Sequence, residues 1–277
     1  MKKIINNPND VVKEALEGMQ MAYKDKLEYV PGFELIVRKD LKNKVGIISG
    51  GGSGHEPLHA GYVGEGMLDV AVAGNIFSSP SPDRISEAIE RVDKGEGVLL
   101  VIKNYSGDIM NFGLSKDMAE ADDKKVATVI VKDDVAVEDS TYSTGRRGIA
   151  GTVFVHKIAG AMAEKGASLE EVERAANKAI ANIRSMGMAM SACTLPAVGK
   201  PGFVLAENEM EVGMGIHGEP GIERTSIKSA KETAKTLLEK ILKDYDYSNS
   251  EVALLVNGLG ATPVSYTHLR AHETDSY

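Results

Sequence analysis

The 277-residue chain has one cysteine, Cys193, and no tryptophan, and aromatic residues make up 5% of it. A lone cysteine cannot form an internal disulfide, which excludes a disulfide-stapled secreted domain. No apolar run is long enough to span a bilayer, and no signal-peptide core follows the N-terminus. Acidic residues outnumber basic ones, 40 to 32, so the composition gives no sign of a positively charged surface that would bind nucleic acid or anionic lipid. We therefore predict a cytoplasmic protein that binds neither nucleic acid nor membrane.

The spacings typical of metal ligands are also missing. Six histidines are present, but none stands in an H-x-x-x-H or H-E-x-x-H pattern, and C-x-x-C is absent, so we predict no bound metal. His59, in the predicted helix after a glycine loop, and His156, on an Ala-rich helix, are interpreted as structural. His268 and His272 lie in a C-terminal segment that we set aside below.

The residues that are present predict an α/β fold. Apolar content of 43% and charged content of 26% are ordinary for globular proteins. Strand-like runs at residues 45–48, 68–73, 98–102 and 126–131 alternate with helical segments, as in a largely buried sheet. Residues 149–184 are predicted to be helical, with a break at Gly166 and a restart at Ser168, an N-cap with Glu171 three positions later.

A second strand-rich region follows, with predicted strands at residues 188–195, 211–215 and 252–256 and an amphipathic helix at 226–243. We predict two α/β domains with mixed, largely parallel sheets flanked by helices, over residues 1–184 and 185–263, the second one incomplete. Residues 264–277 have no apolar period and no caps, and we interpret them as a non-native tail on a truncated chain.

The most informative segment is Ser49-Gly-Gly-Gly-Ser-Gly-His55-Glu-Pro57, which follows a strand directly. Clustered glycines are expected where positive φ is needed or where a ligand approaches bare backbone N–H groups. The segment lacks the Lys-Ser/Thr that ends a P-loop, and no choice of its glycines satisfies G-x-G-x-x-G. This disfavours a nucleotide-binding Rossmann domain, an alternative that a dinucleotide-binding titration would test. We predict a binding loop of another kind.

A second segment, Gly213-Met-Gly-Ile-His217-Gly-Glu-Pro-Gly221, again sets a histidine among glycines before a Glu-Pro pair. With these two loops, the runs IKNYSGD (102–108), DDVAV (133–137) and GRRG (145–148), and the GIHGEPGIER stretch (215–224), the chain resembles the dihydroxyacetone kinase K subunit, or the matching half of single-chain dihydroxyacetone kinases. The resemblance covers residues 1–263. It implies a homodimeric, dihydroxyacetone-binding phosphotransferase subunit of glycerol metabolism.

The resemblance also implies roles for single residues. His217 is expected to add through a ring nitrogen to the ketone carbon and hold the substrate as a hemiaminal. Asp108 is expected to act as a general base on the hydroxyl that is phosphorylated, although its Gly-Asp turn also predicts a helix N-cap near residue 109. His55 shares that task or binds a substrate hydroxyl, and Lys103 donates to a substrate oxygen. Gly52, Ser53 and Gly54 supply further substrate contacts.

The phosphoryl donor is expected elsewhere. The chain shows no P-loop, kinase signature or Asp-rich nucleotide motif, and the resemblance implies a helical partner subunit that carries ADP or ATP with magnesium. The short N-terminus and the separate-subunit arrangement favour the phosphotransferase-system branch, and the ATP-dependent single-chain branch is the alternative. A non-catalytic, ketose-sensing coactivator is a further alternative, which the joint presence of His55, Asp108 and His217 disfavours. The pair Arg146-Arg147 either binds phosphate or caps a turn.

Overall fold

The computed structural model describes residues 4–138 and 145–258, and the chain divides into two compact units. The larger unit comprises residues 2–132 and 152–181, and the smaller unit comprises 133–151 and 182–277. The change of unit near residue 182 lies close to the predicted boundary at 184. Residues 133–151, however, group with the C-terminal part rather than with the N-terminal domain to which we assigned them.

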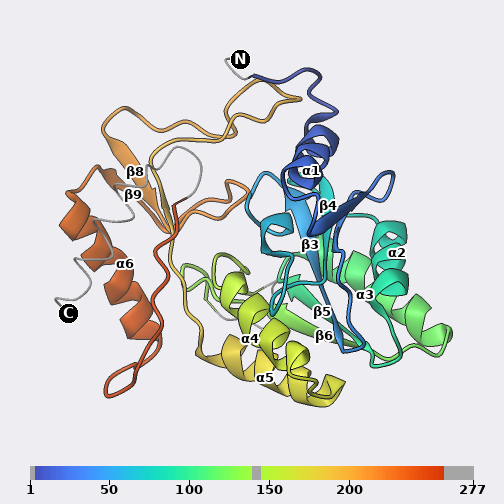
Figure 1. Cartoon of the computed structure of the whole chain (residues 1–277). Helices are drawn as coiled ribbons and strands as arrows, with labels where there is room; N and C mark the ends of the chain where they lie inside the picture. The colour runs from blue at the N-terminus through green and yellow to red at the C-terminus, as the bar shows by residue number, and fades with distance from the viewer. Residues whose placement is uncertain (1–3, 139–144, 259–277) are drawn as a thin grey trace. The chain divides into compact units, whose positions relative to one another are not determined.

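A six-stranded sheet in the order β1-β2-β4-β3-β5-β6 forms the centre of the larger unit (Figure 1). Strands β3 (Gly46–Ser53), β4 (Val70–Ile76), β5 (Val98–Lys103) and β6 (Val126–Val131) are parallel to their neighbours in this set. These four confirm the predicted strands. The hairpin of β1 (Leu27–Val30) and β2 (Leu35–Arg38) was not predicted, and β2 pairs antiparallel with β4.

Helices cover both faces of this sheet. Alternate residues of a strand point to opposite faces, and β2 shows the division: Leu35 and Val37 pack in one apolar core with α2 (Pro82–Val92) and α3 (Ser106–Ala121). Ile36 packs in a second core with Leu16 of α1 (Val11–Ala22) and with the segment around the short 3-10 helix η1 (Ala60–Tyr62). The larger unit is therefore layered, with apolar strands buried between helices.

The two remaining helices of this unit begin and end where the sequence predicts. Helix α4 (Thr152–Glu164) ends before Gly166, which has φ of +81°, and α5 (Leu169–Asn182) follows. The backbone N–H of Glu171 donates to Ser168 Oγ at 3.3 Å, and that of Ser168 donates to Glu171 Oε2 at 3.0 Å. The predicted capping box is confirmed.

The smaller unit contains a three-stranded antiparallel sheet of β7 (Met188–Ala189), β8 (Glu209–Val212) and β9 (Glu223–Ser226), where we predicted a largely parallel one. Helix α6 (Ala230–Asp244) begins later than predicted, because Ser229 and Glu232 form its capping box. Of predicted strand 188–195 only the first two residues are a strand. Residues 252–256 are not a strand: their apolar pattern fits one, but β structure requires a paired neighbour. The tail at 264–277, with His268 and His272, lies outside the described residues.

Candidate functional site

The glycine segment that we predicted to be a loop begins inside β3, which continues to Ser53, and it packs closely against the end of the neighbouring strand. A Cβ atom on Gly52 would lie 2.5 Å from the backbone nitrogen of Ser78, and one on Gly54, which has φ of +106°, would lie 2.7 Å from the ring of Phe77. Ser53 Oγ donates to the carbonyl of Gly74 at 2.8 Å. Part of the need for glycine is therefore steric, since the loop after β4 occupies the space that side chains would fill.

The imidazole of His55 is buried and oriented by two contacts. Its Nδ1 lies 2.9 Å from the carbonyl oxygen of Gly52, and its ring stacks on Phe77 with centroids 4.9 Å apart. A carbonyl oxygen only accepts, so Nδ1 carries the proton and Nε2 of the neutral ring carries the lone pair. Phe77 stands in a loop that the sequence places after a predicted strand but to which it gives no role, and its φ of +56° is unusual for a non-glycine residue.

Lys103 and Asp108 lie at the carboxyl end of β5, the strand next to β3. Lys103 ends β5 with its side chain buried, and its Nζ lies 3.2 Å from the position that a Cβ on Gly51 would take. Asp108 is buried in the first turn of α3, where the helix dipole favours a negative charge. Our N-cap prediction for Asp108 was wrong: α3 begins at Ser106, and Tyr105 is the cap.

The structure therefore brings most of the predicted site residues to one edge of the large sheet. Parallel strands β3, β4 and β5 end side by side there, and ligand crevices of open α/β sheets lie beyond such ends. The residues of this group are Gly52, Ser53, Gly54, His55, Lys103 and Asp108. His217 belongs to the smaller unit.

His217 lies in the turn between β8 and β9, where Glu219 holds it. Its backbone N–H donates to Glu219 Oε2 at 2.8 Å, and its Nδ1 lies 2.9 Å from Glu219 Oε1. Partial burial raises the pKa of Glu219, but the hydrogen bonds from His217 outweigh this and lower it to about 2. An ionised carboxylate only accepts, so Nδ1 carries a proton, and in the neutral form of the ring Nε2 is the nitrogen with the lone pair. Glu219 is another residue to which we gave no role, although it stands in the quoted Glu-Pro pair.

The arginine pair of the smaller unit makes ion pairs with aspartates. Arg147 Nε donates to buried Asp134 at 2.8 Å, and its Nη2 donates to the carbonyl of Gly213, at the start of the His217 turn, at 2.7 Å. Arg146 and Arg184 both pair with Asp244, at 2.9 and 2.5 Å. Both members of the pair thus tie the loop that contains them to other parts of this unit.

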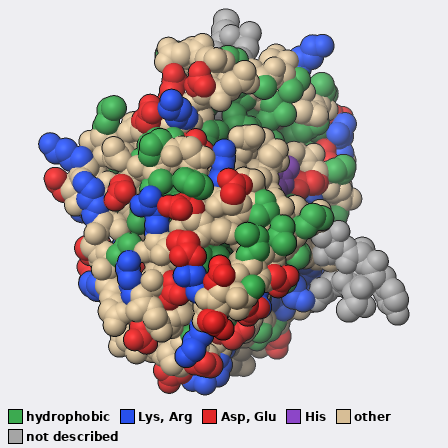
Figure 2. Space-filling view, turned by 90° about the vertical axis from the view of Figure 1, so that its right-hand side faces the viewer, with side chains coloured by type: hydrophobic (Ala, Val, Ile, Leu, Met, Phe, Trp, Pro, Cys, Tyr) green, Lys and Arg blue, Asp and Glu red, His purple; other side chains and the backbone are tan. Residues whose placement is uncertain are grey.

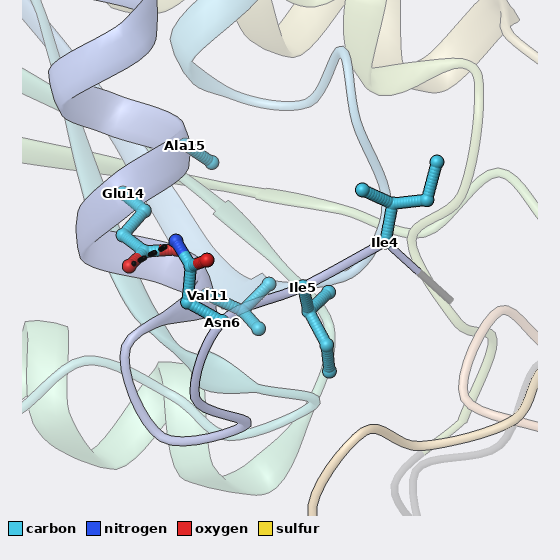
Figure 3. A pocket seen from close by; sticks show the side chains of 6 residues that line it. All are labelled: Ile4, Ile5, Asn6, Val11, Glu14 and Ala15. Carbon is cyan, nitrogen blue, oxygen red and sulfur yellow. Dashed lines mark hydrogen bonds between the residues drawn. The ribbon is translucent and has the colours of Figure 1, made fainter. Parts of the chain in front are cut away.

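Other surfaces offer less. Within residues 4–138 and 145–258, no group of three His, Cys, Asp or Glu side chains could hold a metal, and none of the helices there is long and apolar enough to cross a membrane. Acidic and basic side chains are interspersed over the face in Figure 2. A groove of 340 Å³ beside α1 is lined by Ile4, Ile5, Asn6, Val11, Glu14 and Ala15 (Figure 3). It contains none of the predicted site residues.

Comparison with known proteins agrees with these motifs. The family model described as the Dak1 domain matches residues 17–276, which includes most of the segment after Pro263 that we interpret as non-native. The dihydroxyacetone-binding subunit of the PTS-dependent dihydroxyacetone kinase of Lactococcus lactis is 55% identical over 95% of this chain and 80% of its own length. The corresponding subunit of the PEP-dependent kinase of Escherichia coli is 45% identical over 96% of this chain and 82% of its own.

Solved structures show the same fold. The native dihydroxyacetone kinase of C. freundii superimposes with a TM-score of 0.90 at 36% identity, over 99% of this chain, which spans 51% of that longer one. A dihydroxyacetone kinase operon co-activator superimposes with a TM-score of 0.89 at 35% identity, over 95% of this chain and 81% of its own. This chain therefore belongs to the Dak1 family, with the dihydroxyacetone kinase K subunits.

Proposed function

We propose that this chain is the dihydroxyacetone-binding subunit of a PTS-dependent dihydroxyacetone kinase, and that it holds the ketone as a hemiaminal on His217. A nucleotide-carrying partner subunit then phosphorylates the hydroxyl of the bound substrate. The names of the relatives support the substrate and the reaction class. The observation that carries the covalent step is the hydrogen bond between His217 Nδ1 and the Glu219 carboxylate.

That hydrogen bond suits nucleophilic addition in two ways. It leaves the Nε2 lone pair to attack the ketone carbon, forming a C–N bond while the C=O π electrons move to oxygen. The oxygen takes up one proton from solvent, so the addition consumes a proton overall, and the ring becomes an imidazolium that keeps its Nδ1 proton. The Glu219 carboxylate, with its pKa of about 2, is ionised at neutral pH and stabilises this positive charge.

A covalent anchor on His217 also gives selectivity. Dihydroxyacetone has few apolar atoms from which noncovalent affinity could come, whereas its carbonyl carbon is electrophilic. Glycerol presents similar hydroxyl groups but has no carbonyl to attack, so His217 cannot capture it. We expect the chain to discriminate ketone from polyol by chemistry rather than by the shape of the site.

The residues at the edge of the large sheet are proposed to act on the hydroxyl end of the substrate. Asp108 accepts the hydroxyl proton as the oxygen attacks the donor's terminal phosphorus, and His55, whose Nε2 can only accept, either shares that task or accepts a hydrogen bond from another substrate hydroxyl. Lys103 donates to a substrate oxygen, and Gly52, Ser53 and Gly54, at the end of β3, supply further contacts. ADP or ATP with magnesium is assigned to the partner subunit, and no cofactor to this chain.

Relatives favour the PTS-dependent branch over the fused, ATP-dependent one. The PTS- and PEP-dependent subunits match this chain at 44–55% identity over at least 80% of their own length. The probable dihydroxyacetone kinase of Dictyostelium discoideum matches at 42% over 43% of its length. Of these identities the two highest, 55% and 52%, are to PTS-dependent subunits, which supports that branch.

The co-activator structure supports a second candidate, a ketose sensor that binds the substrate without phosphorylating it. The two functions differ in one measurement. With the nucleotide-carrying subunit of a related kinase and phosphoenolpyruvate-driven phosphotransfer supplied, a kinase subunit forms dihydroxyacetone phosphate and a sensor does not.

Covalent capture is tested by NMR with dihydroxyacetone labelled with ¹³C at the carbonyl carbon. The wild-type chain should give a protein-bound signal in the range of sp³ carbon, and His217→Ala should not. Labelled glycerol serves as the matched ligand and should give no bound signal. An sp³ signal of equal intensity in His217→Ala, or substrate binding in which the carbonyl signal persists, would refute the hemiaminal.

A further inference from the structure

Two histidines that the proposed function does not use, His59 and His156, lie together inside the larger unit. Their ring centroids are 5.4 Å apart, and the His156 side chain is fully buried in α4. His59 precedes η1, and its Nδ1 lies 3.1 Å from Ser49 Oγ in β3. We interpreted both as structural from the sequence, yet their contacts connect them to the site.

The tautomer of His59 follows from the bonds of Ser49. The Ser49 hydroxyl donates its single proton to the carbonyl oxygen of Val101 at 2.7 Å. Its lone pairs are left to accept, so the His59 Nδ1 carries a proton and donates it to Ser49. In the neutral ring, Nε2 is therefore the nitrogen with the lone pair, and it can only accept.

The Nε2 atom of His59 faces the same space as the Lys103 ammonium. It lies 3.4 Å from the position that a Cβ on Gly51 would take, and Lys103 Nζ lies 3.2 Å from that position. Within the described part of the chain, His59 Nε2 is buried without a hydrogen-bond partner, as are both ring nitrogens of His156. A buried acceptor is costly unless a donor satisfies it, and an ammonium offers three donors.

Both imidazoles are neutral at neutral pH. Burial, the nearby Lys103 cation, and then His156 and His55 hold the pKa of His59 well below its usual value. Burial and Lys103 lower the pKa of His156 to about 3. The pair therefore adds no positive charge beside Lys103.

We propose that His59 is a positioning residue: its Nε2 accepts a hydrogen bond from the Lys103 ammonium and orients the remaining donors toward a substrate oxygen. His156 packs against His59 and holds its ring in place. Gly51 allows the approach, since a side chain there would contact both groups. The inference rests on the proposed function, in which Lys103 donates to dihydroxyacetone.

Substitution of His59 by asparagine and by glutamine tests its two ring nitrogens one at a time. In His59→Asn the amide NH₂ corresponds to Nδ1 and keeps the bond to Ser49, but nothing replaces Nε2. In His59→Gln the amide oxygen reaches the place of Nε2 and restores an acceptor. A purely structural role predicts that Asn, which keeps the bond to Ser49, is the better tolerated of the two.

The experiment measures the dissociation constant for dihydroxyacetone by calorimetry, and the melting temperature, for the full chain and its variants. His59→Asn should weaken binding about tenfold or more, which is the effect of losing one charge-assisted hydrogen bond. His59→Gln should stay within about threefold of wild type. In a Lys103→Met background, His59→Asn should have no further effect, because the partner is already gone.

Three results would overturn the inference. Binding by His59→Asn equal to wild type would show that the acceptor is not needed. Equal losses in His59→Asn and His59→Gln, or a His59→Asn loss that persists in the Lys103→Met background, would show a structural role. If the wild-type chain bound no dihydroxyacetone at all, the proposed function itself would fall, and this inference with it.

Discussion

Replacing Glu219 by glutamine tests whether a carboxylate sets the reactive nitrogen of His217. Glutamine keeps the shape of the side chain, but its amide can donate as well as accept. It can therefore pair with an unprotonated Nδ1, which moves the proton to Nε2 and removes the nucleophilic lone pair. Glutamine also carries no negative charge to stabilise the imidazolium that the addition creates.

The structure sets the magnitude of this loss. The pKa of Glu219 falls from an ordinary 4.5 to about 2, which corresponds to about 3 kcal/mol of interaction favouring the carboxylate. Because 32% of the side chain is exposed, we reduce this to roughly 1–2 kcal/mol for solvent screening. This interaction already includes the attraction between the carboxylate and the His217 ring, so the equilibrium constant for the adduct should fall roughly 5- to 30-fold.

The assay is titration of the ¹³C-labelled adduct, with the melting temperature as a check on folding. Glu223→Gln is the matched control, since Glu223 is an exposed glutamate in β9 of the same unit and should leave the adduct unchanged. An adduct in Glu219→Gln within about twofold of wild type would refute the reasoning, because a twofold change is below the range estimated above.

Three further substitutions test other parts of the larger unit. Glu164→Gln removes a carboxylate 2.9 Å from the buried Arg38 guanidinium and should destabilise the fold by about 3 kcal/mol, seen as a melting temperature lower by roughly 6–12 °C. Burial raises the pKa of Glu164, but hydrogen bonds from its basic partners lower it to about 2. The stability that ionised Glu164 contributes is therefore full above pH 4.5 and is lost as the pH falls toward 2. If the wild type lost no more stability than Glu164→Gln between these pH values, this assignment would be contradicted. Asp108→Asn should bind dihydroxyacetone normally but transfer the phosphoryl group roughly 10²-fold more slowly with the partner subunit present, and full activity would remove the general-base role. Gly52→Ala places a Cβ 2.5 Å from the Ser78 nitrogen and should cost roughly 1–3 kcal/mol in chemical denaturation; an unchanged midpoint would show that the loop yields freely.

The large sheet could be predicted from sequence because its parallel strands are buried on both faces. Such strands are continuous apolar runs, as residues 98–102 illustrate, and each was found within a few residues. The hairpin of β1 and β2 is short, with four residues in each strand, and gave too little pattern to detect. Residues 252–256 show the opposite error, since an apolar run says nothing about whether a strand is available to pair with it.

For the candidate site, the sequence offers residue types but not the contacts between them. His55, Lys103, Asp108 and His217 stand in long motifs, and the resemblance gave each a role. The contact that fixes His59 joins Ser49 to a carbonyl 52 positions away, and no local spacing encodes it. Glu219 differs, because it stands only two residues after His217 in a turn framed by glycines. Its hydrogen bond to His217 could therefore have been predicted from the sequence.

The hydrogen-bond partner of Nδ1 distinguishes the roles of three histidines that otherwise share one tautomer. In His55, His59 and His217 the Nδ1 atom donates to a carbonyl, a hydroxyl and a carboxylate in turn, so in the neutral form of each ring the lone pair lies on Nε2. Of these partners a carboxylate stabilises a positive ring most strongly, because it carries the opposite charge, and a ring that forms a covalent bond through Nε2 becomes positive. His59 is suited to the opposite task, since burial and Lys103 keep it neutral and leave it able only to accept. Of the three, His217 is the one whose surroundings favour nucleophilic addition, and this follows from the partner atom rather than from the histidine itself.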